Sequence, residues 1–309
     1  MERNITLDSF KIILSVLVIS AHIFPLFGKD DISSWLISQG VSRLTVPCFF
    51  IINGFFLVSK INSKDAIKKY LSHLIIIYLV WSLIYLSNYA TTLTTRVIVE
   101  NLIFGYYHLW YLPSLMLGVL ILYLIKRKIK NDSLIVSIAI VLFIAGCLLE
   151  VVPTIRIFDT YPNNFRNGLF FGFPFVTIGY YIRYKELHKN MKVKLLLPLT
   201  ILGFGILFAE SYYFYLKSYF FNLYIYYLLL CPVLFLLIMK FSVYKKNNVF
   251  LSYFGSLSAG IYFIHVFIFD RYIVFPTEYT IVKLPLLLLM ATLFSIVIIY
   301  VNKRIKIFL

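Results

Sequence analysis

The sequence predicts an all-α, polytopic integral membrane protein with about ten transmembrane helices and both termini in the cytoplasm. Of its 309 residues 61% are hydrophobic and only 14% are charged, whereas soluble domains carry about 25% charged residues. Apolar runs of roughly 20 residues, the length that crosses a bilayer, recur from end to end. Basic residues gather in short clusters between these runs. We therefore expect one transmembrane domain over 1–309 and no soluble domain.

The apolar runs define ten expected helices, with boundaries good to a few residues. The sixth and seventh are the least regular, because Gly, Pro and Tyr interrupt them. The expected ranges are 7–27, 43–59, 70–88, 109–125, 133–150, 168–183, 194–210, 219–239, 254–274 and 280–301.

The distribution of Lys and Arg between alternate loops predicts the orientation. One set of loops, which includes both termini, holds 20 of the 29 basic residues and the other set holds 8. The remaining one, Lys11, lies within the first expected helix. By the positive-inside rule the richer set is cytoplasmic. We expect a multi-pass protein of a bacterial cytoplasmic (inner) membrane.

The net charge of +16 does not indicate nucleic-acid binding, because its clusters follow the pattern of cytoplasmic loops. Cys48, Cys147 and Cys231 all fall inside apolar runs, so neither disulfides nor a metal site is expected. The first apolar run lacks a small-residue cleavage site and is not expected to be a removable signal. No internal repeat is visible, which weighs against transporter folds built from duplicated halves.

The first expected helix carries a polar stripe formed by Asp8, Lys11, Ser15 and His22. At 100° per residue, the eleven steps from Lys11 to His22 turn about 1,100°, some 20° from three full turns. The four side chains therefore share one face. A rise of about 1.5 Å per residue separates Lys11 from His22 by about 16 Å along the axis.

Two interpretations of this stripe are open. In one, Lys11 extends its amine to the interface and His22 is a neutral hydrogen-bonding residue between helices. In the other, the stripe is functional, because a charged group at the bilayer centre costs about 2.5–3.5 kcal/mol and Ala or Leu would serve packing better. A neutral histidine in a partly dry cavity is well suited to act as a general base on a hydroxyl. We favour the functional interpretation.

Residues 7–11 together with His22 resemble the opening helix of the membrane acyltransferase-3 family. That family has an Arg, ten intervening residues and a His in its first helix. Lys11 stands where the family has Arg, with the spacing intact. A lysine cannot make the bidentate contact with phosphate that a guanidinium makes.

Two further segments in the first half of the chain resemble the family. Residues 46–57 are similar to its second-helix motif, with Asn53 in place of the usual Ser. Pro47 and Gly54 would expose polar backbone or the Asn53 amide to a cavity, or would simply kink the helix for packing. Residues 107–111 match the family's His-Leu-Trp segment, which places His108 on the same membrane side as His22, while Trp110 also fits an aromatic-belt anchor.

Segments later in the chain extend the resemblance. Arg166, just before the sixth expected helix, would hold a glycan hydroxyl or carboxylate, with Glu150 as a possible partner, or is an ordinary loop residue. Residues 256–265 are similar to the family's Ser-x-Gly-Ile-Tyr-x-x-His signature. Within them Ser258, Tyr262 and His265 share one face, which suits either a cavity lining or core hydrogen bonding.

Lys68 and Lys69 precede the third expected helix, where the family often shows Arg-x-x-Arg; here the second cation is absent because Ser72 occupies its position. The pair would receive the phosphates of coenzyme A, although an ordinary positive-inside loop explains it as well. The resemblance covers nearly the whole chain in the same order.

The resemblance implies a membrane acyltransferase that moves an acetyl group from acetyl-CoA to a hydroxyl of a cell-surface polysaccharide, such as O-antigen or capsule, or of its lipid-linked precursor. His22 would be the general base, in a catalytic stripe with Lys11 and Asp8. Lys11, Lys68, Lys69 and Ser15 would hold the donor. No metal is expected. The acceptor would be contacted by Asn53, His108, Trp110, Arg166, Tyr262 and His265.

Two other classes of function are considered. A transporter or flippase for a glycan or lipid intermediate would move its substrate without acetyl-CoA. A non-catalytic membrane scaffold would need neither a buried Lys11 nor His22.

Overall fold

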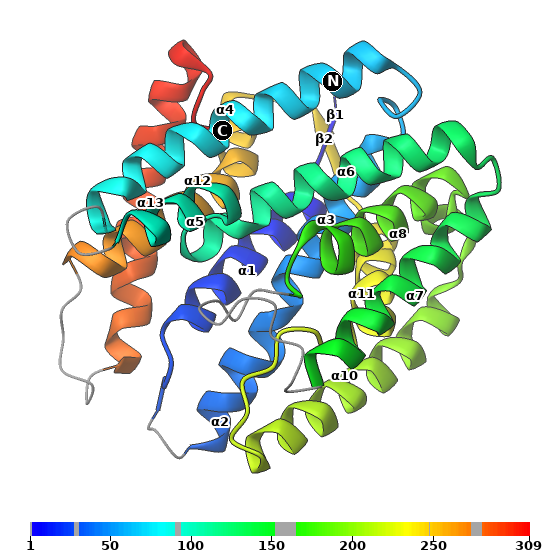
Figure 1. Ribbon diagram of the computed structural model, residues 1–309, viewed down its shortest axis with the longest axis horizontal. Helices are drawn as coiled ribbons and strands as arrows, with labels where there is room; N and C mark the ends of the chain where they lie inside the picture. Colours follow the sequence, from blue (N-terminus) through cyan, green and yellow to red (C-terminus); the bar gives the residue numbers. More distant parts are fainter. Residues whose placement is uncertain (1, 28–30, 90–93, 152–164, 247, 273–279) are drawn as a thin grey trace. The chain divides into compact units, whose positions relative to one another are not determined.

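The computed structural model describes residues 2–27, 31–89, 94–151, 165–246, 248–272 and 280–309 (Figure 1). Within these residues eight helical segments are long and apolar enough to cross a membrane, which confirms the all-α, polytopic fold class. They comprise α1 (Ile5–His22), the run from α2 (Ile32–Trp35) through η1 (Leu36–Gly40) and η2 (Val41–Leu44) to α3 (Thr45–Leu57), α4 (Lys64–Tyr89), η3 (Tyr107–Trp110) with α6 (Tyr111–Lys128), α7 (Asp132–Val151), α10 (Val193–Leu216), α12 (Val249–Tyr272) and α13 (Thr280–Ile305).

Each of the ten expected ranges contains a helix, but two of these helices are short. The sixth range holds η4 (Gly168–Gly172) followed by α8 (Phe173–Tyr184), and the eighth holds α11 (Tyr227–Lys240). The sequence reasoning did not anticipate α5 (Thr95–Phe104), α9 (Leu187–Asn190) or the two short strands β1 (Glu2–Asn4) and β2 (Tyr244–Lys246). The number of membrane crossings and the cytoplasmic termini stay predictions.

The chain forms two compact units, each described by itself. The first comprises Met1–Thr45, His73–Leu109 and Phe241–Leu309. The second comprises Val46–Ser72 and Trp110–Lys240.

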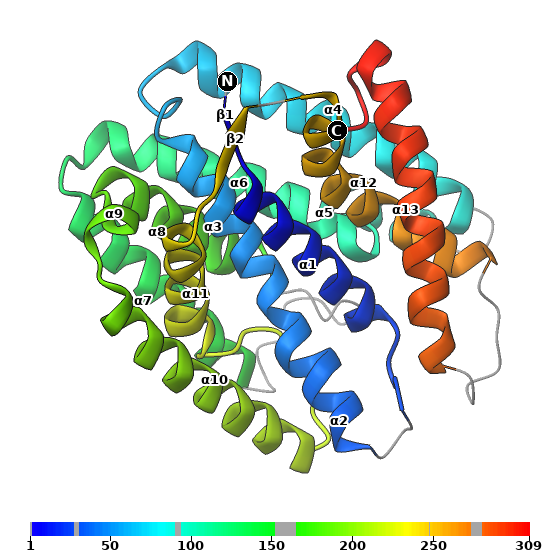
Figure 2. The same cartoon turned by 180° about the vertical axis from the view of Figure 1, so that it is seen from behind.

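In the first unit α1 packs against α12, and α12 packs against α13 (Figures 1 and 2). Strand β1 pairs antiparallel with β2, and Arg3 lies opposite Lys245. The chain's two ends are thereby attached to this unit, since the indole N–H of Trp81 also donates to the carbonyl of Phe308 at 3.0 Å. Trp81 stacks on Phe263 with a centroid distance of 5.3 Å and forms part of the buried core.

Helix α1 is bounded by local signals at both ends. The Asn4 side chain accepts a hydrogen bond from the backbone N–H of Leu7 at 3.0 Å, which caps the first turn. The helix ends at His22, five residues before the expected boundary. Pro25 follows closely and disfavours helical backbone in the residue before it. His22 therefore lies in the last turn of α1 rather than in mid-helix.

In the second unit, α3 and α8 cross at close range through glycines. A Cβ at Gly54 would lie 2.0 Å from the Val176 carbonyl oxygen, and one at Gly179 would lie 2.0 Å from that of Ile51. Small residues at such crossings let membrane helices approach closely.

Helix α11 begins at Tyr227, eight residues after the expected start at 219. Two buried or half-buried carboxylates take up the backbone N–H groups of the preceding segment. Glu150 accepts from the backbone N–H groups of Asn222 and Leu223, each at 3.0 Å. Glu210 accepts from Ile225 at 2.9 Å and from Tyr226 at 3.1 Å. These N–H groups are satisfied without helix formation, so an apolar composition there does not produce a helix.

Candidate active site

Three histidines, His22, His108 and His265, form a cluster in the first unit, here called the histidine cluster. Their ring centroids are 5.2 Å apart for His22 and His265, 6.5 Å for His22 and His108, and 4.9 Å for His108 and His265. His108 and His265 are buried, whereas His22 is half-buried. His22 is therefore the member of the cluster that a substrate can reach most directly.

The position of His265 is fixed by its own helix. Its Nδ1 lies 2.8 Å from the carbonyl oxygen of Tyr262 and 3.2 Å from that of Ile261. A carbonyl only accepts, so Nδ1 carries the proton and Nε2 is the basic nitrogen. Nε2 is buried and has no hydrogen-bond partner among the described residues. His265 thus presents an unprotonated nitrogen within the cluster.

His108 is positioned through its backbone. The hydroxyl of Tyr262 donates to the His108 carbonyl at 2.6 Å, and neither ring nitrogen of His108 has a well-aligned hydrogen bond within the described chain. His108 follows a tight turn in which Gly105 and Tyr107 have φ of 92° and 50°. A positive φ is uncommon for a non-glycine residue and frequent at functional sites.

Two tyrosines belong to this neighbourhood although the sequence reasoning did not select them. The Tyr107 ring lies 5.6 Å from the His22 ring. Tyr85 is fully buried, with its ring 5.3 Å from that of His108. Its hydroxyl donates to the Phe263 carbonyl at 2.8 Å and accepts from the backbone N–H of Phe267 at 3.0 Å. Tyr85 therefore links α4 to α12 on either side of His265.

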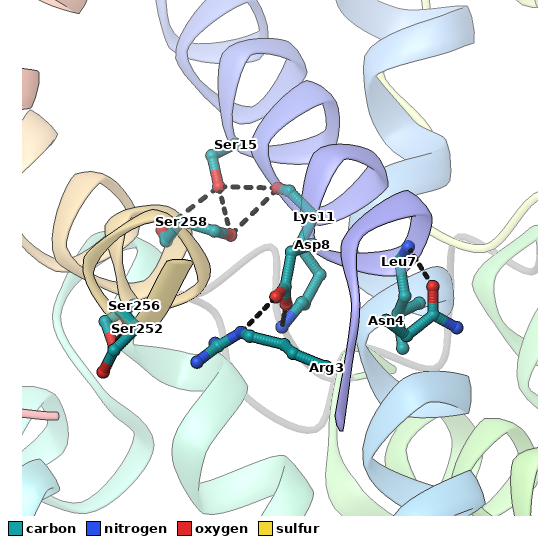
Figure 3. A network of polar contacts seen from close by, with 9 residues as sticks. All are labelled: Arg3, Asn4, Leu7, Asp8, Lys11, Ser15, Ser252, Ser256 and Ser258. Atoms are coloured by element: carbon teal, nitrogen blue, oxygen red, sulfur yellow. Dashed lines mark hydrogen bonds and ion pairs between the residues drawn. The ribbon is translucent and has the colours of Figure 1, made fainter. Parts of the chain in front are cut away.

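At the other end of α1, Asp8 is buried and holds two cations (Figure 3). Lys11 Nζ lies 2.6 Å from Asp8 Oδ1, and Arg3 Nε lies 2.5 Å from Asp8 Oδ2. The side chains of Lys11 and Arg3 are 22% and 26% exposed. Arg3 was counted in the sequence only as a terminal basic residue; its role here depends on the β1 strand, which no motif signalled.

The middle of the polar stripe is a helix–helix contact. Ser15 is fully buried, and its hydroxyl lies 2.7 Å from that of Ser258 on α12. The Ser258 hydroxyl also donates to the carbonyl of Lys11 at 2.9 Å (Figure 3). The stripe thus faces α12 along its length, from Ser15 against Ser258 to His22 against His265.

In the second unit Asn53 is the centre of a hydrogen-bonded chain. Its amide donates to the hydroxyl of Tyr111 at 2.8 Å and to the carbonyl of Phe49 at 2.9 Å, and its carbonyl accepts from the hydroxyl of Tyr70 at 2.9 Å. The Lys60 amine lies 4.4 Å from the centre of the Tyr70 ring, and burial lowers the pKa of Lys60. Lys60 is a half-buried cation that the sequence reasoning counted only as a loop residue.

Trp110 is buried and contacts both Phe171 and Arg166. It stacks on Phe171 with centroids 5.8 Å apart and planes 10° from parallel, and the Arg166 guanidinium lies 5.0 Å from its ring centre. A tryptophan packed in this way positions Arg166 by cation–π attraction and exposes only 6% of its own surface. Lys68 and Lys69 are exposed in the early turns of α4.

Comparison with known proteins identifies the family. The profile described as "Acyltransferase domain", that of the acyltransferase-3 family, matches residues 4–301. The chain belongs to the acyltransferase-3 family. It is a membrane acyltransferase by family and by its apolar helices.

Curated relatives of this acyltransferase-3 chain carry racemase names. It is 28% identical over 224 residues to an amino-acid racemase of Enterococcus faecalis, covering 64% of this chain and 32% of the relative. It is 26% identical over 235 residues to a serine/alanine racemase of Enterococcus gallinarum, covering 68% and 33%. The chain thus spans about a third of the length of these relatives. No solved structure matches it.

The structure brings together part of the set that the sequence selected. His22, His108, Tyr262 and His265 meet in the first unit of the acyltransferase, and Asp8 with Lys11 forms a separate group at the start of α1. Asn53, Trp110 and Arg166 belong to the second unit, as do Lys68 and Lys69. Among the described residues no group of three His, Cys, Asp or Glu side chains could hold a metal ion.

Proposed function

We propose that this acyltransferase moves an acetyl group from acetyl-CoA to a hydroxyl of a cell-surface polysaccharide or of its lipid-linked precursor. The observation that carries the proposal is the histidine cluster, in which half-buried His22 lies against two buried histidines. An imidazole that can accept a proton is the group that acyl transfer to an alcohol requires.

In the proposed reaction His22 takes the proton of the acceptor hydroxyl. The hydroxyl oxygen attacks the thioester carbonyl, and the tetrahedral intermediate then expels the thiolate as the C–S bond breaks. The thiolate takes the proton from His22, which regenerates the base, and the products are the acetyl ester and coenzyme A. Of the donors that the sequence suggested, His108 lies in the histidine cluster with His22, and its ring N–H is proposed to stabilise the oxyanion.

The donor is proposed to approach α1 from the side of Lys11 and Asp8. Lys11 is partly exposed and held by Asp8 at 2.6 Å, so its amine has a defined position from which to contact a phosphate. Lys68 and Lys69 are exposed cations that are proposed to assist. Ser15 contributes through the contact with Ser258 that aligns α1 on α12.

The acceptor is proposed to contact Arg166, Trp110 and Asn53. Arg166 lies over Trp110, and a planar guanidinium with several N–H donors is suited to contact sugar hydroxyls or a carboxylate. The names of the relatives concern amino acids, and this chain spans only a third of those proteins. A glycan hydroxyl remains the proposed acceptor because an imidazole base is suited to activate an alcohol for attack on a thioester.

The test is mass spectrometry of surface polysaccharide from cells with the chain, without it, and with His22→Ala. We expect an acetyl mass difference that depends on the chain and is lost in His22→Ala at unchanged membrane levels. His73→Ala is the matched control, because His73 is a half-buried histidine of the same unit outside the cluster. Acetylation by His22→Ala would refute the base assignment, and glycan export without acetylation would favour a transporter or flippase.

A further inference from the structure

The part of α12 that follows His265 carries an exposed carboxylate, Asp270, to which the proposed reaction gives no role. Asp270 lies about 7.5 Å beyond His265 along the helix axis, at a rise of about 1.5 Å per residue. Its carboxylate accepts a hydrogen bond from the Tyr106 hydroxyl, and its Oδ2 lies 3.5 Å from Asn88 Nδ2. These residues all belong to the first unit.

Asp270 has no counter-ion in the part of the chain that the structure describes. No lysine or arginine there forms an ion pair with it. The adjacent Arg271 contacts α4 instead, where its Nε donates to Asn88 at 3.0 Å and its Nη2 to the Ser87 carbonyl at 2.9 Å. A carboxylate has about four positions that accept a hydrogen bond. Its contacts with the neutral Asn88 and Tyr106 leave positions that an incoming donor can use.

Two tyrosine rings connect Asp270 to the histidine cluster. The Tyr106 ring lies 5.4 Å from that of Tyr107, which in turn lies 5.6 Å from that of His22. Tyr107 is 50% exposed although its φ is 50°, an unusual conformation for a bulky residue. Strained backbone of this kind gathers at ligand sites. Tyr107 therefore presents an accessible ring directly beside His22.

The chemistry of these groups fits a sugar. A monosaccharide ring has apolar C–H faces, which pack on an aromatic ring, and hydroxyl groups at its edge, which donate to a carboxylate in charge-assisted hydrogen bonds. A phosphate or an acidic sugar would be repelled by Asp270, because like charges brought together cost free energy. The arrangement thus favours a neutral sugar unit over an anionic ligand.

We propose that Asp270 and Tyr107 form a binding subsite for a neutral monosaccharide unit, in which Tyr107 packs on the sugar ring and Asp270 accepts from its hydroxyls. The unit is held beside His22, to which it can present a hydroxyl. That this sugar is the acetyl acceptor rests on the proposed function. That these two residues bind a sugar does not.

The experiment measures sugar binding by the full chain in the absence of an acyl donor. The chain is reconstituted in lipid nanodiscs, because a maltoside detergent would itself present a sugar. The probe is the fluorescently labelled oligosaccharide fraction released from the surface polysaccharide of cells that lack the chain. We expect Asp270→Ala to weaken binding about tenfold, the loss of one charge-assisted hydrogen bond. Asp270→Asn keeps a carbonyl oxygen as an acceptor and should weaken binding less.

Variants of Tyr107 test the ring separately from the turn that carries it. Tyr107→Phe keeps the ring and should bind like the parent. Tyr107→Asn removes the ring, and asparagine is among the residues that adopt a positive φ most readily, so the turn is kept. We expect Tyr107→Asn to weaken binding about three- to tenfold, the range measured for aromatic contacts.

The first unit supplies a matched control for each residue. Glu100 is a carboxylate that Arg96 already pairs at 2.9 Å, and Tyr300 of α13 is a tyrosine that is 57% exposed. Glu100→Ala and Tyr300→Ala should bind the oligosaccharides like the parent. The thermal midpoint of every variant is measured alongside, and the conservative variants Asp270→Asn and Tyr107→Phe keep the test open if Asp270→Ala does not fold.

Three outcomes would overturn the proposal. The parent does not bind the oligosaccharides, or Asp270→Ala and Tyr107→Asn bind them like the controls, or Asp270→Asn loses as much affinity as Asp270→Ala. The last outcome would mean that the carboxylate binds a cationic group. Sugar binding that depends on Asp270 and Tyr107 without acetyl transfer by the parent would refute the proposed function and keep the subsite. Acetyl transfer that neither variant affects would keep the proposed function and reject the subsite.

Discussion

At the scale of single residues, the least replaceable geometry in the first unit is that of His265. Its Nδ1 is committed to the carbonyls of its own helix at 2.8 and 3.2 Å, which directs the chemistry of the ring to Nε2. Its ring lies 5.2 Å from that of His22. The arrangement makes His265 a positioning residue, since its fixed ring packs against the ring of His22.

We expect His265→Ala to lower acetyl transfer at least about tenfold, a fraction of what a general base contributes, and to shift the pH at which transfer is half-maximal. An Asn side chain can keep the N–H that is donated to the helix carbonyls. His265→Asn should therefore retain the fold, and its transfer should be half-maximal at the same pH as in the parent. The measurement is the pH profile of acetyl transfer in membranes. Ser256→Ala is the control, because the Ser256 hydroxyl likewise donates within α12, to the Ser252 carbonyl at 3.1 Å. An unchanged profile in His265→Ala would limit this residue to packing.

Asn53 gives a second residue-scale prediction. Asn53→Leu removes the hydrogen bonds that the Asn53 side chain makes with the Tyr70 and Tyr111 hydroxyls, and each such bond contributes about 0.5–1.5 kcal/mol. We expect a lower thermal midpoint in detergent for Asn53→Leu and a smaller loss for Asn53→Ser, which keeps a hydroxyl. A Leu variant as stable as the parent would show that the two tyrosine hydroxyls find other partners.

The sequence predicted these residues one by one but not their grouping. His22, His108 and His265 come from α1, η3 and α12, and their spacing along the chain carries no information about tertiary contact. The stripe on α1 could be predicted because it depends only on helical periodicity. Arg3 could not, since its position depends on a strand pairing and on a glycine more than 200 residues away in the chain.

At the scale of elements, glycines set the closest helix crossings. Gly179→Ala places a methyl group 2.0 Å from the Ile51 carbonyl oxygen, so α3 and α8 have to separate. Overpacking of this kind costs about 1–3 kcal/mol. We expect a lower thermal midpoint and a lower yield of monodisperse protein for Gly179→Ala.

The chain supplies a matched control for this substitution in Gly205 of α10. A Cβ at Gly205 would meet nothing within 4 Å, and alanine is favoured over glycine within a helix by about 0.5–1 kcal/mol. Gly205→Ala should therefore leave the thermal midpoint unchanged or raise it. If both variants behave alike, the α3–α8 crossing is not constrained by its glycines.

Helix boundaries were predicted less well than helix existence, for a reason that α11 illustrates. The residues from 219 to 226 are as apolar as a helix core, yet their N–H groups are taken by Glu150 and Glu210 from α7 and α10. Hydropathy measures the tendency to leave water and is insensitive to such tertiary caps. The start of α1 was closer to the prediction because its cap, Asn4, is adjacent in sequence.

At the scale of the whole molecule, composition alone predicted the fold class, since too few charged residues are available to cover a soluble surface. The pairing of β1 with β2 agrees with the charge pattern, because it joins two segments that were both assigned to the cytoplasmic set. This agreement concerns only the first unit. Sidedness of the whole chain is a property of the protein in its membrane, and it calls for a labelling experiment.

Cysteine accessibility in intact bacterial cells tests the predicted orientation. The native Cys48, Cys147 and Cys231 are buried, so background labelling by a membrane-impermeant maleimide should be low. The positions chosen for new cysteines are all exposed: Lys64 and Lys130 from the cytoplasmic set, Arg96 and Lys217 from the outer set. We expect Arg96→Cys and Lys217→Cys to be labelled in intact cells, and Lys64→Cys and Lys130→Cys only after permeabilisation.

The contradicting outcome is labelling of Lys130→Cys and Lys217→Cys on the same side. Those two positions are separated by α7, α8 and α10, so this outcome would break the alternation between their loops and with it the even number of crossings. The expected pattern would instead support the alternation of loops on which the predicted cytoplasmic location of both termini rests.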